Sequence, residues 1–547
     1  MDRRTLFAIA LMLVVAIVPT MLFPPKRPVP APKLAVDSAL RDTAAVAAPS
    51  PRAAPLSVRV PATAPGAESG LVEEPVTVTA PWYQYTFSTR GARLIGASLM
   101  EYRTFARGDS GLAQLIPNES EFLAYRLVVG ADTLSLADWR FQASERDVRV
   151  GDGAALDWVA QRGPVEVRLR YRFLPEQYLF RVEGEVSGLG TGGLVLIGLG
   201  PRLNVVDADS VGDIRSYGIV TKAGSTQNLA FGSLDPGERR ELAGPFEWVA
   251  VKSKYFMAAV LTTDDRGPRL GGAVAVGGQR PGGYESQAHV TASLAAPAGR
   301  FQFAVYAGPQ EYRRLARIGH NLEDINPYGW IFRPIIRPFS ILIMQILLWM
   351  HDALRLAYGW VLVLFGIGVR VLLWPLNQKA MRSSVAMQAI QPEMKALQER
   401  YKSDPQKMQQ ELFKLYKQHG VHPLGGCLPM LLPMPVLFAL FFVFANTIEF
   451  RGVPFLWLPD LSRADPLYII PLVMGLSMYA LSKIGQIGIP PNPQMKMMLY
   501  IMPVMFTVLF LNFASGLNLY YAVSNIASLP QQWLIARERM RRVGKTT

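Results

Sequence analysis

Residues 356–375 read LAYGWVLVLFGIGVRVLLWP, an apolar run that contains one charge, Arg370. A helix of about 20 residues is about 30 Å long, which is enough to cross the hydrocarbon core of a bilayer. An arginine inside such a helix costs roughly 2.5–3.5 kcal/mol on insertion scales, so it usually faces protein or a water-filled cavity. Near a helix end, however, its side chain can simply reach the headgroups. The run predicts a membrane span over 356–376, with Arg370 either at a functional site or at the interface.

A basic soluble segment, 377–422, follows this span, and its excess of lysine and arginine predicts a cytoplasmic location. Narrow apolar stripes lie on both sides of Ser403, Asp404 and Pro405, which predicts an antiparallel hairpin of two helices. Pro392 is expected to kink or interrupt the first helix. A hairpin held only at its base suits the first capture of a nascent chain, so we expect it to contact the ribosome or targeting factors.

Four more apolar runs within 423–535 predict transmembrane helices 3 to 6, and a basic cytoplasmic tail follows at 536–547. One face of the last run is polar and carries Asn518, Tyr521, Asn525, Ser528 and Gln532, with Ser524 beside them. An unpaired amide is costly in hydrocarbon, so a row of them does not face lipid tails. The row predicts either hydrogen bonds between helices or the lining of a wet cavity.

The fifth predicted span is rich in methionine and also brings two polar residues, Thr507 and Asn512. Its methionines include Met498, Met502 and Met505. Flexible thioether side chains suit a surface that must fit many apolar shapes. We therefore expect this helix to contact apolar segments of varied sequence.

Four segments precede the central span. Residues 1–24 have a short basic start and an apolar run, which predicts an uncleaved anchor with its N-terminus in the cytoplasm. Residues 25–75 are rich in proline and alanine and predict an extended linker. Residues 76–325 alternate apolar and polar, as in VEVRLRYRF (165–173), which predicts a large antiparallel β-sandwich outside the cytoplasm. Residues 326–355 are interrupted by proline and arginine and predict a helix at the outer membrane interface.

Composition and motifs exclude several classes of protein. The net charge of +14 over 547 residues fits basic cytoplasmic loops better than specific DNA binding, and the one cysteine, Cys427, excludes an intramolecular disulfide. We find no P-loop, no H-E-x-x-H motif and no intramembrane pair of aspartates, and His419 and His422 have no further ligand near them. We therefore expect no catalytic residues, no metal and no cofactor. An intramembrane hydrolase and a transporter of small anions remain as alternatives.

Several stretches closely resemble the YidC membrane protein insertases. In the helical part these are GVRVLLWPL (368–376), the basic hairpin, HPLGGCLP (422–429) and SGLNLYYAVSN (515–525). In the β-rich part, WVAVKSKYF (248–256) and FSTRG (87–91) resemble the periplasmic domain of the Gram-negative members.

The resemblance implies a protein of the bacterial inner membrane that inserts nascent membrane proteins, alone or beside the Sec translocon. It implies six transmembrane helices with both termini in the cytoplasm and a periplasmic β-supersandwich domain. Five of the spans would form the insertase core around a hydrophilic groove. There Arg370 would attract acidic residues of the incoming segment, which then passes into the membrane lipids.

By position, the family's groove arginine falls on Arg370 and its substrate-contacting tyrosine pair on Tyr520 and Tyr521. The expected substrate-binding residues are Arg370, Met498, Met502, Met505, Asn512, Asn518, Tyr520, Tyr521, Ser524 and Asn525. The chain departs from better-known members at three positions, where it has Gly366 instead of threonine, Pro433 instead of glutamine and Asn512 instead of tryptophan.

Overall fold

The computed structural model describes residues 73–543, except positions 107, 119, 131 and 152 and the segments 189–192, 264–268, 280–286, 327–332, 421–433 and 489–492. The anchor expected at 1–24 and nearly all of the linker expected at 25–75 lie outside the described residues, as does Pro433.

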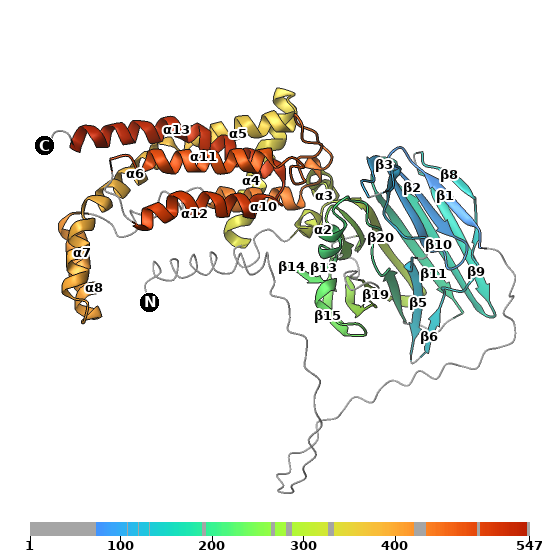
Figure 1. Ribbon diagram of the computed structural model, residues 1–547. Helices are drawn as coiled ribbons and strands as arrows, with labels where there is room; N and C mark the ends of the chain where they lie inside the picture. The colour runs from blue at the N-terminus through green and yellow to red at the C-terminus, as the bar shows by residue number, and fades with distance from the viewer. Residues whose placement is uncertain are drawn as a thin grey trace, which may run out of the picture. The chain divides into compact units, whose positions relative to one another are not determined.

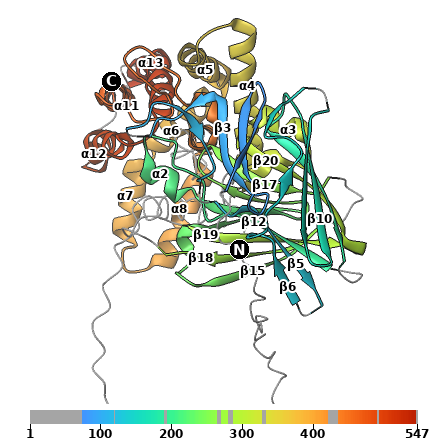
Figure 2. The same ribbon diagram turned by 90° about the vertical axis from the view of Figure 1, so that its right-hand side faces the viewer.

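Three β-sheets make up the first part of the described chain (Figure 1). The nine-stranded sheet has the order β14 (Thr226–Ala230), β13 (Gly218–Lys222), β16 (Trp248–Lys252), β17 (Phe256–Leu261), β20 (Arg300–Pro309), β11 (Leu179–Ser187), β10 (Val165–Phe173), β9 (Ala155–Arg162) and β7 (Gln142–Ala143). The six-stranded sheet has the order β15 (Arg239–Phe246), β18 (Leu270–Gly277), β19 (Ala288–Ala296), β12 (Gly193–Leu199), β5 (Phe122–Val129) and β6 (Asp132–Ser135). The five-stranded sheet has the order β4 (Leu112–Gln114), β3 (Leu94–Arg103), β2 (Tyr83–Ser88), β1 (Pro75–Thr79) and β8 (Asp147–Arg149). Figure 2 shows β15, β18, β19 and β12 side by side.

The alternating sequence pattern explains the layers. In β10 every second side chain is buried, from Val165 to Phe173, while the arginines between them are exposed. The buried Tyr171 packs against Phe87 of β2, with ring centroids 5.3 Å apart, and its hydroxyl lies 2.9 Å from that of Tyr125 in β5. The five- and six-stranded sheets therefore pack on the same face of the nine-stranded sheet, and one continuous apolar core lies between the layers.

The strands β16 and β17 are buried along their whole length. Their second face is covered by the chain after β20, which forms α3 (Tyr312–Ile318) and the 3₁₀ helix η4 (Leu322–Ile325). Trp248 donates its indole N–H to the carbonyl of His320 at 3.1 Å, and Lys222 forms a buried ion pair with Asp324 at 3.1 Å. These contacts fix the end of the β-rich region just before the helices begin. The remaining short elements of the β-rich region are α2 (Ser210–Arg215), η1 (Phe231–Ser233) and η3 (Pro297–Gly299).

The C-terminal part of the described chain is helical (Figure 1). Its elements are α4 (Arg333–Leu354), α5 (Tyr358–Leu372), α6 (Trp374–Ala389), α7 (Gln391–Arg400), α8 (Pro405–Gln418), α10 (Met434–Asn446), η7 (Ile448–Phe450), α11 (Ile469–Gly485), α12 (Pro493–Phe510) and α13 (Ser515–Val543). Taken one at a time, none of the described helices meets the length and hydropathy required of a membrane span. The segments Ile336–Leu354 and Tyr358–Leu372 meet them together, across a bend of 119°.

Helix α13 packs between α5 and α11, and small residues allow the close approach of the helices. A methyl group at Gly475 of α11 would lie 1.9 Å from Oγ1 of Thr507 in α12. One at Gly516 of α13 would lie 2.4 Å from the Phe444 ring of α10. Buried apolar residues of α4, α5, α10, α11, α12 and α13 form a second core.

The hairpin predicted after the central span is built from α6, α7 and α8. The first helix breaks at Ile390, two residues before Pro392 in the first turn of α7, and α7 and α8 pack together. The turn lies at 401–404, where the Asp404 carboxylate accepts a hydrogen bond from the Lys407 amide at 3.0 Å and caps α8.

The loop between α10 and α11, residues 447–468, contacts the β-rich region through the buried Ile448 and through Arg451. Arg451 is 3% exposed and pairs with Asp207 at 2.7 Å. It also donates to the carbonyls of Arg103 and Val206, at 3.0 and 2.9 Å, and lies 4.5 Å from the ring centroid of Phe105. We call these contacts the Arg451 clasp.

The same loop also holds the start of α13. The amides of Ser515 and Gly516 donate to the carbonyls of Arg463 and Leu461, at 2.6 and 2.9 Å. The first amides of a helix have no partner within the helix, so the loop supplies what α13 lacks.

Candidate functional site

Arg370 lies in the last turn of α5, with its side chain partly buried against α13. Its Nε donates a hydrogen bond to the Ser524 hydroxyl at 2.6 Å. Among the residues that the structure describes, no carboxylate forms an ion pair with it. The guanidinium is thus held in place by a neutral group, and its charge is not neutralised by a described neighbour.

The tyrosine pair lies one turn before Ser524 on α13. Tyr520 packs on Phe365 of α5, with ring centroids 5.8 Å apart, and Tyr521 packs on Phe510 of α12 at 5.6 Å. A methyl group at Gly366 would lie 3.5 Å from the Tyr520 ring. The tyrosines are therefore directed toward opposite neighbouring helices, and Gly366 leaves room for one of them.

Polar contacts continue along α13 toward its C-terminal end. Gln531 accepts a hydrogen bond from the Asn377 side chain and donates one to the carbonyl of Trp374, both at 3.0 Å. Sequence reasoning missed this pair, although Gln531 is two turns beyond Ser524 on the same helix. Together with Arg370 these groups make a polar seam between α13 and the region where α5 passes into α6. We call Arg370, Ser524, Gln531 and Asn377 the polar seam.

The polar row predicted on α13 divides between different helices. Asn525 donates to the Ser477 hydroxyl of α11 at 3.3 Å, and Ser528 donates back to the Ser524 carbonyl at 2.7 Å. Asn518 is fully buried and donates to the carbonyl of Phe510, the last residue of α12, at 2.9 Å. The sequence allowed two interpretations of this polar row, hydrogen bonds between helices or the lining of a wet cavity. Asn518, Asn525 and Ser528 make hydrogen bonds between or within helices.

Three of the expected site residues, Asn512, Met502 and Met505, lie elsewhere. Asn512 is exposed in the turn between α12 and α13, so it is not in line with Arg370 and Ser524. Met505 is 48% exposed on α12 and Met502 is partly buried there. Met498 belongs to α12, but its side chain lies outside the described part of the structure. Exposed apolar residues on α12 and α11 accompany Met505, namely Ile501, Val504, Val508, Leu472 and Leu476.

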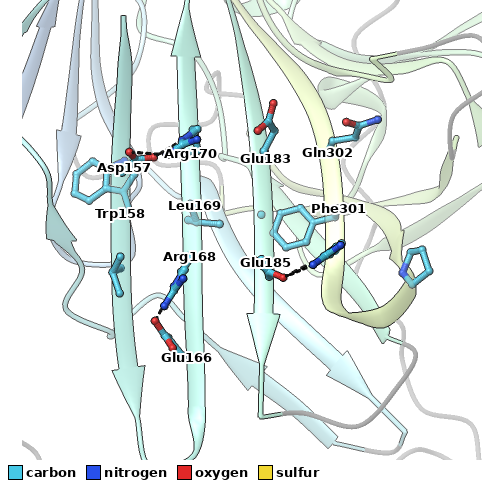
Figure 3. A pocket seen from close by; sticks show the side chains of 14 residues that line it. Asp157, Trp158, Glu166, Arg168, Leu169, Arg170, Glu183, Glu185, Phe301 and Gln302 are labelled. Atoms are coloured by element: carbon cyan, nitrogen blue, oxygen red, sulfur yellow. Dashed lines mark hydrogen bonds and ion pairs between the residues drawn. The ribbon is translucent and has the colours of Figure 1, made fainter.

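A hollow of about 790 Å³ lies on the exposed face of the nine-stranded sheet (Figure 3). Figure 3 shows two cross-strand ion pairs in it, Asp157–Arg170 and Glu185–Arg300, and one within β10, Glu166–Arg168. The charges in these pairs are matched and solvated, and the described lining holds no nucleophile with an adjacent base. Within the described ranges no cluster of three or more potential metal ligands occurs. The polar seam is therefore the stronger candidate for function.

Comparison with known proteins identifies relatives of both parts of the chain. The family model for the YidC periplasmic domain matches residues 75–342, and that for the 60Kd inner membrane protein matches residues 349–542. The membrane protein insertase YidC of Chlorobaculum tepidum is 30% identical, over 97% of this chain and 94% of its own length. That of Chloroherpeton thalassium is 33% identical, over 68% of this chain and 66% of its own length.

Solved structures give a weaker comparison. A crystal structure of an active YidC insertase is 19% identical and covers 85% of this chain and 93% of its own, with a TM-score of 0.35. A galactose mutarotase related enzyme from Lactobacillus acidophilus is 10% identical and covers 43% of this chain, with a TM-score of 0.26. Neither superposition is close enough to support an argument about the site.

Proposed function

The chain belongs to the YidC membrane protein insertases, and from this premise we propose how its helical region carries out insertion. It is an insertase with a β-rich domain and a helical C-terminal region, acting on membrane proteins as they are made. The polar seam forms the floor of a hydrophilic groove among the helices. The groove receives the polar flank of an incoming segment, and the apolar faces of α11 and α12 receive its apolar part.

Arg370 supplies the attractive charge. A polar flank must otherwise cross about 30 Å of hydrocarbon. A guanidinium held by a neutral hydroxyl, with no described carboxylate beside it, keeps its positive field for an acidic residue of the client. A fixed charge that is partly shielded from bulk water by protein attracts more strongly than one in water. The contact of Arg370 with Ser524 is the single observation that carries this proposal.

Release into the membrane needs no nucleotide. The apolar side chains exposed on α12 and α11, such as Val504 (64%) and Leu476 (68%), offer a surface with the polarity of lipid tails. Burial of about 20 apolar residues in lipid is itself favourable, so the client leaves the groove downhill in free energy. Flexible side chains such as Met502 and Met505 fit clients of different shape.

We place the chain in the inner membrane with six spans, both termini in the cytoplasm and the β-rich domain in the periplasm. The hairpin α6–α8 and the basic tail then face the ribosome or targeting factors, and the protein acts alone or with the Sec translocon. The basic excess of the hairpin and the family match of residues 75–342 support this orientation.

Site-specific photo-crosslinking tests the proposal. A crosslinkable amino acid at Tyr521, or at Arg370, should capture a stalled nascent chain with one apolar segment and an acidic flank. The same group at Val159, which is 39% exposed on β9, serves as the control and should capture none. Equal capture from all three positions, or none from 370 and 521, would rule out the groove. Capture that disappears in excess small anion, with normal insertion, would favour an anion site instead.

A further inference from the structure

An exposed apolar turn projects from the loop between α10 and α11. The amide of Phe455 donates to the carbonyl of Leu458 and the amide of Leu458 to that of Phe455, both at 2.9 Å. Leu456 and Trp457 lie at the tip of this turn and are 68% and 38% exposed. We call Pro454–Pro459 the apolar tip, and it contains no charged residue.

The tip is held in a conformation that its sequence does not favour. Leu456 has a φ of 54°, in the left-handed region where glycine or asparagine is the usual residue. A bulky side chain in that conformation is strained, and such strain persists where the surrounding structure imposes it. The chain therefore keeps a large apolar side chain in an exposed place where a small or polar residue would fold more easily.

The rest of the loop forms a rigid frame around the tip. On one side the Arg451 clasp joins the loop to the β-rich region, and on the other the Leu461 amide donates to the Val453 carbonyl at 2.9 Å. The Trp457 indole donates to Asp465 at 3.2 Å, and Asp465 accepts from the amide of Ile470 at the start of α11. The tip is thus presented outward by fixed contacts and is not a loose surface loop.

The tip continues the apolar surface of the helices. The Phe455 ring packs edge-on against Trp360 in the first turn of α5, with centroids 5.4 Å apart, and Trp360 is itself 51% exposed. At the start of α11, Leu467 and Tyr468 are 59% and 48% exposed. Tryptophan and tyrosine concentrate where a membrane meets water, because one end of each ring is apolar and the other polar.

We infer that the apolar tip is a lipid anchor, whose Leu456 and Trp457 enter the boundary between headgroups and acyl chains of the leaflet on the side of the β-rich domain. The leaflet assignment rests on the orientation given under Proposed function. The anchor fixes how deep the α5 and α11 ends lie in the membrane, and with them the level of the polar seam. Lipid is the occupant because the tip is continuous with the exposed apolar faces of the helices and is bordered by exposed tryptophan and tyrosine side chains.

Depth-dependent quenching in proteoliposomes tests the anchor. Cys427 is first replaced by serine, and single cysteines then carry an environment-sensitive fluorophore at Leu456, at Leu194 of β12 and at Leu476 of α11. Leu194 and Leu476 are 43% and 68% exposed and serve as water and bilayer controls. Lipids with a quencher near the headgroup should quench the label at 456 several-fold more than that at 194. Lipids with a quencher deep in the chains should quench 476 more than 456.

A label at 456 that behaves like the one at 194 would overturn the anchor. Pro454→Cys places the label beside the strained position and answers the question if Leu456→Cys does not fold. A label at 456 that is shielded from water in detergent, but is quenched by neither lipid, would show that protein covers the tip and would also overturn the anchor. This experiment measures the depth of the label and not client insertion, so its result does not test the insertase function. Failure of the 476 control alone would count against the membrane placement instead.

Discussion

At the scale of single residues, the partly buried Arg370 resembles Lys252, which is also held by a neutral group, the side-chain oxygen of Asn326 at 2.6 Å, and differs from two other buried cations. Lys222 and Arg451 are each paired with an aspartate, whereas Arg370 is held by the hydroxyl of Ser524. The sequence could indicate Arg370 because it is the only charge in its apolar run, and Ser524 because it lies beside the polar row. It could not indicate that Asn518 caps α12, since that role depends on where the neighbouring helix ends.

Replacement of Arg370 separates charge from geometry. Arg370→Ala should lower the insertion rate of a client with an acidic flank by about tenfold, equivalent to ~1.4 kcal/mol, because the attractive field is lost. Arg370→Lys should keep most of the activity, since it keeps the charge. Ser524→Ala, which removes only the hydrogen bond, is the matched control and should cost less than the alanine change at 370. The measurement is insertion into proteoliposomes of clients with acidic and neutral flanks. If Arg370→Lys were as defective as Arg370→Ala, the planar guanidinium and its paired hydrogen bonds would matter more than the positive charge alone.

A second prediction concerns Glu449 in the loop after α10. Both carboxylate oxygens are buried without a hydrogen bond of ordinary geometry, and burial raises the pKa of this group from 4.5 to about 7. The pKa in the folded state is thus higher than in the unfolded chain, so the contribution of Glu449 to stability is full below about pH 4.5 and is lost as the pH rises through 7. Glu449→Gln should remove this pH dependence and stabilise the protein at pH 8 by up to about 3 kcal/mol.

The pH prediction is checked by unfolding of detergent-solubilised protein at pH 5 and pH 8. Glu241→Gln, on a side chain that is 70% exposed, is the control and should change neither value. If Glu449→Gln were equally destabilising at both pH values, the carboxyl would be making contacts that the amide cannot replace.

At the scale of elements, the alternation of apolar and polar residues predicted strands well where one face of the sheet is exposed, and poorly where both faces of the sheet are buried. VEVRLRYRF in β10 shows period two, whereas FMAAVL in β17 is buried throughout and has no period. In the helical part the apolar runs indicated helices, and a helix was expected within 326–355, where α4 includes Pro338. The bend after Leu354, with Arg355 at φ 53°, has no local signal such as glycine.

Helix contacts give the third prediction. Gly475→Ala should destabilise the packing of α11 on α12, because the added methyl group would lie 1.9 Å from the Thr507 hydroxyl and the helices would have to separate. Gly368→Ala is the matched control, since nothing lies within 4 Å of the added atom and alanine favours a helix by about 1 kcal/mol. Thermal unfolding in detergent should show a lower midpoint for the first variant and an equal or higher one for the second. The opposite order would mean that α11 and α12 are not in this contact.

The hairpin gives the fourth prediction. Its tip, the turn at 401–404, is charged and is held by the Asp404 cap, whereas the exposed pair His419–Glu393 lies at the base of the hairpin, so little apolar burial fixes the tip. Removal of residues 399–407 with a short glycine linker should slow client capture while the helices of the second core remain folded. Hydrogen exchange of the intact protein should show 399–407 less protected than 439–444. Strong protection of the tip, or normal capture by the shortened chain, would leave the hairpin as merely a solvated surface.

At the scale of the whole molecule, the Arg451 clasp joins residues that no local pattern relates. Asp207 and Arg451 are 244 positions apart, and neither carries a sequence signal for the other. Both are nearly buried, so removing one leaves an uncompensated group. Family resemblance indicated the two regions of the chain, but this contact between them follows only from the structure.

The fifth prediction concerns this contact. Arg451→Ala should destabilise the attachment of the loop to the β-rich region by about 3 kcal/mol or more, because Asp207 loses its ion pair. Hydrogen exchange should rise at 451–453 and 461–463. Arg333→Ala is the control, since Arg333 contacts the Thr226 hydroxyl of β14 at 2.6 Å without touching the loop. Asp207→Asn in the Arg451→Ala background should restore part of the protection. Unchanged exchange in Arg451→Ala would show that the clasp does not hold the loop.

The Arg451 clasp also constrains the order in which contacts form while the chain is being synthesised. At roughly 5–20 residues per second, about 12–50 s separate the synthesis of Asp207 from that of Arg451, which lies 244 positions later. During this interval the β-rich domain can fold, but Asp207 lacks its arginine partner. The amides of Ser515 and Gly516 can form their hydrogen bonds with the loop only later, because they are synthesised after Arg451. The polar seam needs Ser524 of α13 and is therefore completed only after this helix has been made, so a chain that has reached Arg370 but not Ser524 carries the arginine without its partner.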